Sequence, residues 1–76
     1  MKEVLEYVAR HLVDDPDAVE VTEEEGDRSV ILRLKVAPDD MGKVIGKRGR
    51  TVRAIRSVVR AASREGRSTM VEIVET

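Results

Sequence analysis

Cysteine is absent from this chain of 76 residues, and histidine occurs only once, at His11. Disulfide bonds are therefore excluded, and a metal site built on the usual nitrogen and sulfur ligands is not expected. Because a domain of this size often depends on a disulfide, a metal ion or a partner subunit for stability, self-association is the option that remains. The lack of cysteine is also compatible with a reducing cytosol.

Aromatic residues are scarce, since the chain contains one tyrosine and neither phenylalanine nor tryptophan. Single-strand binders of the RRM and OB types stack bases on aromatic side chains, so that mechanism is not expected here. No stretch approaches the roughly 20 apolar residues that span a bilayer, and no apolar signal core follows Met1. We therefore expect a soluble, cytoplasmic protein that does not bind a membrane.

Catalytic groups are also few. His11 stands alone on a predicted helix, and no serine has a base close to it in sequence. Nucleophilic and acid–base catalysis need such groups side by side. We expect neither an enzyme nor a cofactor nor a small-molecule substrate.

The formal net charge of -1 conceals a strong asymmetry along the chain. Residues 1–40 carry 12 acidic and 5 basic side chains, whereas residues 41–67 carry nine basic side chains and only Glu65 as an acid. A phosphate backbone responds to the local field near a basic segment rather than to the total charge. Residues 41–67 are therefore the segment expected to meet a polyanion.

Hydrophobic periodicity divides the chain into six elements, in the order helix, strand, strand, helix, helix, strand. Helical spacing, with Asp39 or Asp40 as an N-cap and Gly46 and Gly66 as helix stops, predicts helices over residues 2–13, 41–45 and 50–64. Alternating patterns predict strands over residues 18–23, 30–36 and 70–74. The acidic run at residues 23–25 is expected to lie in a solvated turn.

This order predicts an α+β fold, with one domain over residues 1–76. The first two strands are expected to form an antiparallel hairpin, and a two-helix crossover leads to the last strand, which would run parallel to the second. The expected architecture is a three-stranded mixed sheet with three helices packed on one face.

The most informative segment is the basic, glycine-containing stretch between the last two helices. Gly46 and Gly49 can adopt backbone angles that are closed to other residues, and they leave room for a polymer to approach. Lys47 and Arg48 add two cations, and the start of the following helix favours negative charge. A Gly-x-x-Gly motif alone is a weak signal, so its context decides the interpretation.

That context resembles a known family. The motif Val44-Ile45-Gly46-Lys47-Arg48-Gly49 between two helices resembles the GXXG signature of KH domains, and the order of elements is similar to their type II fold. The flanking segments at residues 38–42 and 51–56 resemble the small bacterial KhpA family of RNA-binding proteins. The resemblance implies binding of about four nucleotides of single-stranded RNA, an RNA-chaperone-like role, homodimers, and pairing with a larger KH protein of the KhpB (Jag) type.

Transferred to this sequence, the resemblance assigns RNA binding to the loop and its surroundings, which are Ile45, Gly46, Lys47, Arg48, Gly49, Arg50 and Arg53. Aliphatic side chains would have to hold the bases, and the candidates for such a groove are Ile31, Leu32, Val52 and Ile55. Ordinary core packing is the favoured alternative for Val52 and Ile55, because a small domain needs every apolar contact.

The long helix carries two further predicted surfaces. One is an arginine stripe opposite the apolar face, formed by Arg53, Arg56, Arg60 and Arg64, for which a solvated face is the alternative. The other is a shoulder of small apolar residues, Ala54, Val58 and Ala61. The shoulder is either a peripheral core contact or a helix-against-helix dimer interface.

Two competing functions remain open from the residues. The domain could be a protein-interaction module with a vestigial loop, although the paired cations Lys47 and Arg48 count against this. It could also bind single-stranded DNA, since the loop would contact the backbone and no group is committed to the 2′-hydroxyl. Competition between matched RNA and DNA oligomers separates the two nucleic acids.

Overall fold

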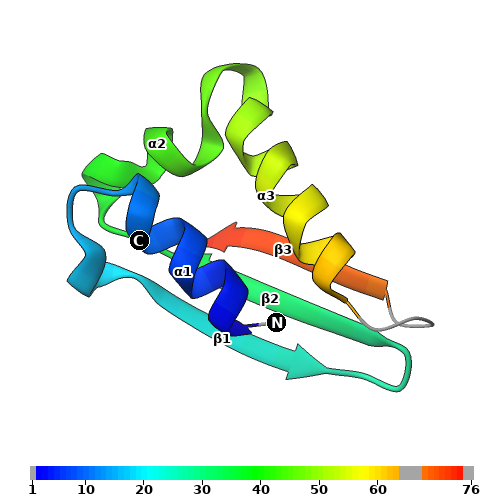
Figure 1. Ribbon diagram of the computed structural model, residues 1–76. Coiled ribbons are helices and arrows are strands. Elements are labelled where there is room, and N and C mark those ends of the chain that lie inside the picture. Colours follow the sequence, from blue (N-terminus) through cyan, green and yellow to red (C-terminus); the bar gives the residue numbers. More distant parts are fainter. Residues whose placement is uncertain (1, 64–67, 75–76) are drawn as a thin grey trace.

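The computed structural model describes residues 2–63 and 68–74 and confirms the predicted order of elements (Figure 1). The helices and strands are α1 (Lys2–Leu12), β1 (Glu20–Glu25), β2 (Ser29–Lys35), α2 (Met41–Ile45), α3 (Arg50–Ala62) and β3 (Ser68–Val74). Three single 3-10 turns lie between them, at Pro16–Ala18, Pro38–Asp40 and Lys47–Gly49. None of the described helices is both long enough and apolar enough to cross a membrane.

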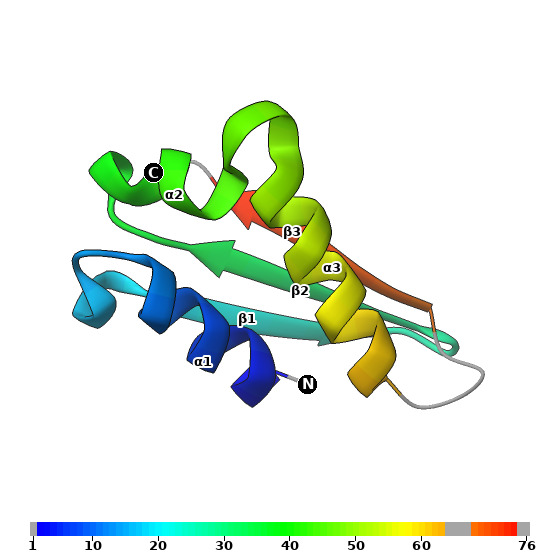
Figure 2. The same ribbon diagram turned by 45° about the horizontal axis from the view of Figure 1, so that its top comes forward.

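The three strands form one mixed sheet in the order β1-β2-β3, so the predicted α+β architecture is confirmed. β1 pairs with β2 in antiparallel register, with Val21 opposite Leu34, and β3 pairs with β2 in parallel register, with Val71 opposite Leu32. All three helices cover the same face of this sheet (Figures 1 and 2). The other face is open, and β3 is an edge strand.

Alternation along the central strand sets the position of the core. Val30, Leu32 and Leu34 of β2 are buried beneath the helices, whereas Ile31 and Arg33 point to the open face. The helices contribute Leu5 and Ala9 from α1, Val44 from α2, and Ile55 and Val59 from α3. The apolar faces expected from periodicity thus meet in one cluster between the two layers.

Two boundaries at the hairpin differ from the sequence prediction. β1 starts at Glu20 rather than at residue 18, because Pro16–Ala18 closes a 3-10 turn. It then continues through the acidic run, where Glu25 pairs with Val30. The prediction of a turn at residues 23–25 was therefore wrong, because cross-strand pairing overrides the weak strand preference of glutamate.

The long helix is shorter than its periodicity predicted. α3 ends at Ala62, and Ser63 is extended, with φ -75° and ψ 153°. The Ser63 hydroxyl donates to the carbonyl oxygen of Val59 at 3.0 Å and pairs with the Thr69 hydroxyl at 2.8 Å. The predicted helix stop at Gly66, like Arg64 of the arginine stripe, lies outside the described residues.

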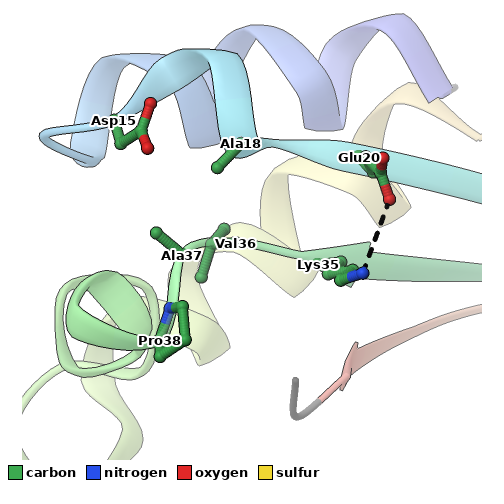
Figure 3. A pocket seen from close by; sticks show the side chains of 7 residues that line it. All are labelled: Asp15, Ala18, Glu20, Lys35, Val36, Ala37 and Pro38. Carbon is green, nitrogen blue, oxygen red and sulfur yellow. Dashed lines mark ion pairs between the residues drawn. The ribbon is translucent and has the colours of Figure 1, made fainter.

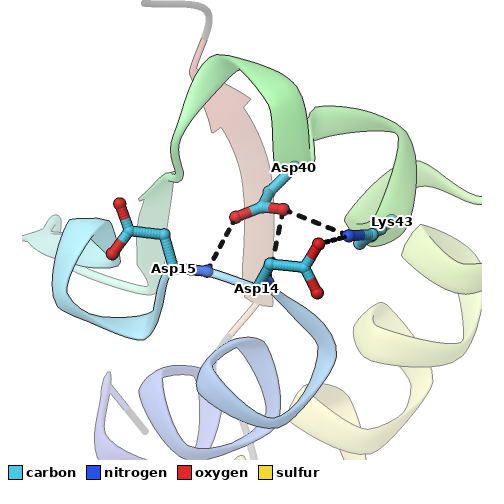
Figure 4. A network of polar contacts seen from close by, with 4 residues as sticks. All are labelled: Asp14, Asp15, Asp40 and Lys43. Carbon is cyan, nitrogen blue, oxygen red and sulfur yellow. Dashed lines mark hydrogen bonds and ion pairs between the residues drawn. The ribbon is translucent and has the colours of Figure 1, made fainter.

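A buried carboxylate joins the end of α1 to the start of α2 (Figure 4). Asp40 is 2% exposed and accepts hydrogen bonds from the backbone N–H groups of Asp14 at 3.3 Å and Asp15 at 3.1 Å. Lys43 forms an ion pair with Asp14 and lies 3.5 Å from Asp40. This Asp40 junction fixes the position of α2, the helix that leads into the glycine loop.

Candidate nucleic-acid interface

The glycine loop between α2 and α3 has an unusual backbone conformation that explains its two glycines. Gly46 has φ 75° and ψ 174°, and Gly49 has φ 75° and ψ 17°. A side chain at Gly46 would also overlap the side chain and the backbone nitrogen of Thr51. Arg48 adopts a left-handed conformation, with φ 57° and ψ 27°, which is unfavourable for a residue with a side chain.

Short hydrogen-bonded turns hold this backbone. The N–H of Gly46 donates to the carbonyl of Gly42 at 2.8 Å, and that of Gly49 to Gly46 at 3.2 Å. The N–H of Arg50 donates to the carbonyl of Lys47. These turns surround Lys47 and Arg48, whose side chains are exposed.

Three cations lie in this loop and directly after it. Lys47, Arg48 and Arg50 are exposed and line one hollow of about 180 Å³. No acidic residue occurs between Asp40 and the last described residue before the gap, Ser63. The potential at the loop is therefore positive, in contrast to the negative total charge of the chain.

Arg53 lies one turn beyond the loop and contacts the loop itself. Its Nε donates to the carbonyl oxygen of Gly49 at 3.3 Å, and its Nη2 donates to that of Arg48 at 3.1 Å. The sequence placed Arg53 among the groups that reach phosphates, but could not indicate these two contacts. These two hydrogen bonds attach the guanidinium of Arg53 to the last two carbonyl groups of the loop.

Arg56 does not lie on a purely solvated helix face, which was the alternative for the arginine stripe. Its Nε and Nη2 lie 3.4 and 3.3 Å from the carbonyl oxygen of Val71 on the edge strand β3. Together with Arg60, Met70 and Val71 it lines a hollow of about 270 Å³ between α3 and β3. Arg56 therefore connects the helix to the strand, while Arg60 is exposed beside it.

Met70 is the residue of this hollow that sequence reasoning missed. Met70 is 54% exposed, because β3 alternates and Met70 points to the open side of the sheet. Only the parallel pairing of β3 with β2 places it beside α3 at the sheet edge. The alternation of Met70 with the buried Thr69 and Val71 was a signal in the sequence that Met70 faces away from the core. The sequence held no signal for its position at the sheet edge.

The four candidates for an aliphatic groove do not come together. Leu32 is 0% exposed, and Val52 and Ile55 are also buried, as the core alternative held. Ile31 lies on the open face of the sheet, opposite to the side covered by the helices. Only Ile45, which is 37% exposed next to Gly46, combines an apolar side chain with access to the loop.

The apolar shoulder of α3 is a surface feature rather than a core contact. Val58 is 47% exposed, and Ala54 and Ala61 are exposed on either side of it in the helix.

A further hollow, of about 380 Å³, lies at the end of the sheet beside the Glu20–Lys35 ion pair (Figure 3). None of the predicted site residues lines it. The described residues contain no cluster of side chains suited to hold a metal ion.

Comparison with known proteins gives a consistent result. Residues 2–73 match the family described as "KhpA/KhpB, KH domain". The RNA-binding protein KhpA of Clostridium acetobutylicum is 56% identical over 75 residues, which cover 97% of this chain and 100% of that protein. The RNA-binding protein KhpA of Aquifex aeolicus is 45% identical over 76 residues, which cover 99% of this chain and 96% of that protein.

A solved structure supports the fold alone. The crystal structure of Aquifex aeolicus Era bound to GDP and aluminium fluoride superposes with a TM-score of 0.57 at 19% sequence identity. The match covers 97% of this chain and 30% of the Era chain. The arrangement of helices and strands therefore recurs as one part of a larger protein.

Proposed function

Since this chain belongs to the KhpA/KhpB family of KH domains, with the type II fold, we propose that it binds single-stranded RNA through the loop Gly46–Gly49. The observation that carries the proposal is the group of three exposed cations, Lys47, Arg48 and Arg50, which line one hollow at the glycine loop. Cations in this arrangement contact phosphates without reading a base.

The N-terminus of α3 strengthens this anion site. α3 begins at Arg50, directly after the loop, so its partial positive charge points toward the same place. A phosphate held by Lys47 and Arg48 would also lie beside Arg50, which lines the same hollow. In a KH domain such a loop clamps about four nucleotides.

The course of the RNA beyond the loop follows from the hollow between α3 and β3. Arg60 and Met70 are exposed there, and the Arg56 guanidinium lies at its base on Val71. We place the nucleotides that follow the clamped phosphates along this hollow. Ile45 at the loop and Met70 at the strand edge would supply the apolar surface against which bases pack, in place of aromatic stacking.

This mode of binding predicts modest affinity and a loose sequence preference, because few bases would be stacked or bonded. The affinity should fall with salt, with a slope of about -2 in a plot of log K against log [salt] if three phosphates are neutralised on a single strand. No covalent chemistry is involved. The RNA-chaperone-like role stays a prediction from the family resemblance.

The proposal is tested with Lys47→Asp/Arg48→Asp, measured for binding to a labelled single-stranded RNA pool at low and physiological salt. Lys2→Asp/Arg28→Asp is the matched control, since it makes the same change in charge at the start of α1 and in the β1–β2 turn. We expect the loop variant to lose more than about tenfold in affinity and the control to lose little. Equal binding by all three proteins would instead favour a protein-interaction module, and equal competition by matched DNA would remove the preference for RNA.

We also propose that the shoulder of Ala54, Val58 and Ala61 supports self-association or pairing with a larger KhpB-type protein. The exposure of Val58 at the centre of a patch of small residues favours this, since two such helices can approach closely. We expect the wild type to sediment as a dimer and Val58→Asp as a monomer, with Ser57→Asp on the neighbouring exposed position as the control. A Val58→Asp protein that stays dimeric would remove this interface.

A further inference from the structure

The guanidinium of Arg53 connects the first turn of α3 to the backbone of the glycine loop. Two of its N–H groups donate to consecutive carbonyl oxygens, those of Arg48 at 3.1 Å and Gly49 at 3.3 Å. A planar guanidinium suits this task because its donors have a fixed spacing and direction. The ammonium of a lysine is a point charge and cannot reproduce the pair.

The carbonyls that Arg53 holds belong to the least favourable part of the loop. Arg48 has a left-handed backbone, and Gly49, which follows it, has a positive φ as well. Such conformations persist only when the surroundings fix them. Turn bonds from the N–H groups of Gly49 and Arg50 also hold this part of the loop.

From this geometry we infer that Arg53 is a positioning residue, which holds the loop in the conformation that presents Lys47 and Arg48 to a ligand. This inference rests on the proposed function and gives Arg53 a different role from that of a direct phosphate contact. Because the peptide groups that follow residues 48 and 49 are fixed at their carbonyl oxygens, the left-handed backbone of Arg48 is kept in the absence of a ligand. The loop is thus pre-organised for an anion.

The substitution Arg53→Lys separates the two roles, because it keeps the charge and removes the paired hydrogen bonds. If Arg53 positions the loop, Arg53→Lys and Arg53→Ala should both weaken RNA binding by about tenfold, the factor expected for two ordinary hydrogen bonds. If Arg53 only neutralises a phosphate, Arg53→Lys should bind as the wild type does. That second result would overturn the inference.

Amide hydrogen exchange on the free protein gives a test that does not depend on RNA. We expect the N–H groups of Gly49 and Arg50 to exchange about tenfold faster in both variants, while that of the buried Leu32 is unchanged. The same substitutions at Arg10, an exposed helix arginine paired with Glu6 at 3.4 Å, serve as controls and should not change exchange in the loop.

The two readouts distinguish failure of the inference from failure of the proposed function. Unchanged exchange at Gly49 and Arg50 in Arg53→Lys and Arg53→Ala would overturn the positioning role, whatever the RNA affinity. A wild-type protein that binds neither RNA nor DNA would overturn the proposed function, while faster exchange in the variants would still support Arg53 as the residue that holds the loop.

Discussion

Two groups of cations in this chain differ in their surroundings. On the sheet and at the Asp40 junction they are paired, as Arg33 is with Glu24 at 2.7 Å and Glu72 at 3.3 Å, and Lys43 is with Asp14. At the glycine loop, Lys47, Arg48 and Arg50 have no carboxylate partner within the described part of the chain. Paired cations stabilise the fold, whereas those of the loop are available to a ligand.

The comparison explains why the total charge is a poor guide to this protein. Pairing raises the pKa of Arg33, chiefly through its hydrogen bond to Glu24, and raises the pKa of Lys43, chiefly through its hydrogen bond to Asp14. These positive charges are compensated within the molecule. Carboxylates of the described residues therefore pair with Arg33 and Lys43 and not with Lys47, Arg48 or Arg50, so the positive field of the loop is left largely intact.

The largest effect on RNA affinity is expected from Gly46→Ala, which disrupts the loop that carries the second group of cations. A Cβ atom at Gly46 would overlap Thr51, and its φ of 75° with ψ of 174° is a conformation almost restricted to glycine. The loop must then rearrange, and we expect RNA affinity to fall more than about thirtyfold, as for loss of 2 kcal/mol or more. Binding is measured by fluorescence anisotropy on a labelled RNA.

The matched control for this prediction is Gly42→Ala. Gly42 lies within α2, and a Cβ atom there would meet nothing within 4 Å. Alanine should therefore stabilise the helix slightly and leave RNA binding unchanged. If Gly46→Ala bound RNA as well as Gly42→Ala did, the conformation of the loop would not matter for binding.

A smaller effect, on stability rather than on binding chemistry, is expected from Asp40→Asn. The amide can accept one of the two backbone hydrogen bonds but not both, and it loses the attraction of Lys43. We expect the melting temperature at neutral pH to fall by roughly 5–10 °C for a domain of this size. Asp39→Asn, at the exposed neighbour, should change it little.

The pH dependence of this effect has a definite sign. Burial of the Asp40 carboxylate acts to raise its pKa, but the hydrogen bonds from Asp15 and Asp14 and the charge of Lys43 outweigh it and lower the pKa. The stability that Asp40 contributes is therefore complete above the ordinary aspartate pKa of about 4 and is lost as the pH falls through the lower pKa of the folded state. The gap between wild type and Asp40→Asn should close in acid, and a gap that widened there would contradict this account.

Much of this architecture could be predicted from the sequence because it depends on local patterns. The periodicities located all six elements, and the glycine pair with its cations located the loop. The predicted ends of the helices and strands were less accurate wherever a tertiary contact determines them. β1 extends through the three glutamates because β2 pairs with them, and α3 ends where the Ser63 hydroxyl contacts Thr69.

The candidate site was predictable in its centre and not at its margins. Lys47, Arg48 and Arg50 gather as expected, because they are neighbours in sequence. Arg56 and Met70 meet only through the parallel register of β3 beside α3, which no local pattern encodes. Alternation grouped Leu32 with the other apolar positions of β2 and grouped Ile31 with Arg33, and the structure places Leu32 in the core and Ile31 on the open face.

The smallest effect is expected from Arg33→Gln, which tests the paired side of the comparison. The ion pairs of Arg33 are exposed on the open face of the sheet, and such pairs contribute little to stability, so the melting temperature should fall by no more than about 3 °C. RNA affinity should change by less than about twofold, because the sheet and its solvent screen this face from the loop.

Arg48→Gln removes the same charge from the loop and should lower RNA affinity by about fivefold. Equal losses of affinity in the two variants, measured at the same ionic strength, would mean that the RNA senses only the total charge. The division between paired and available cations would then have no bearing on binding.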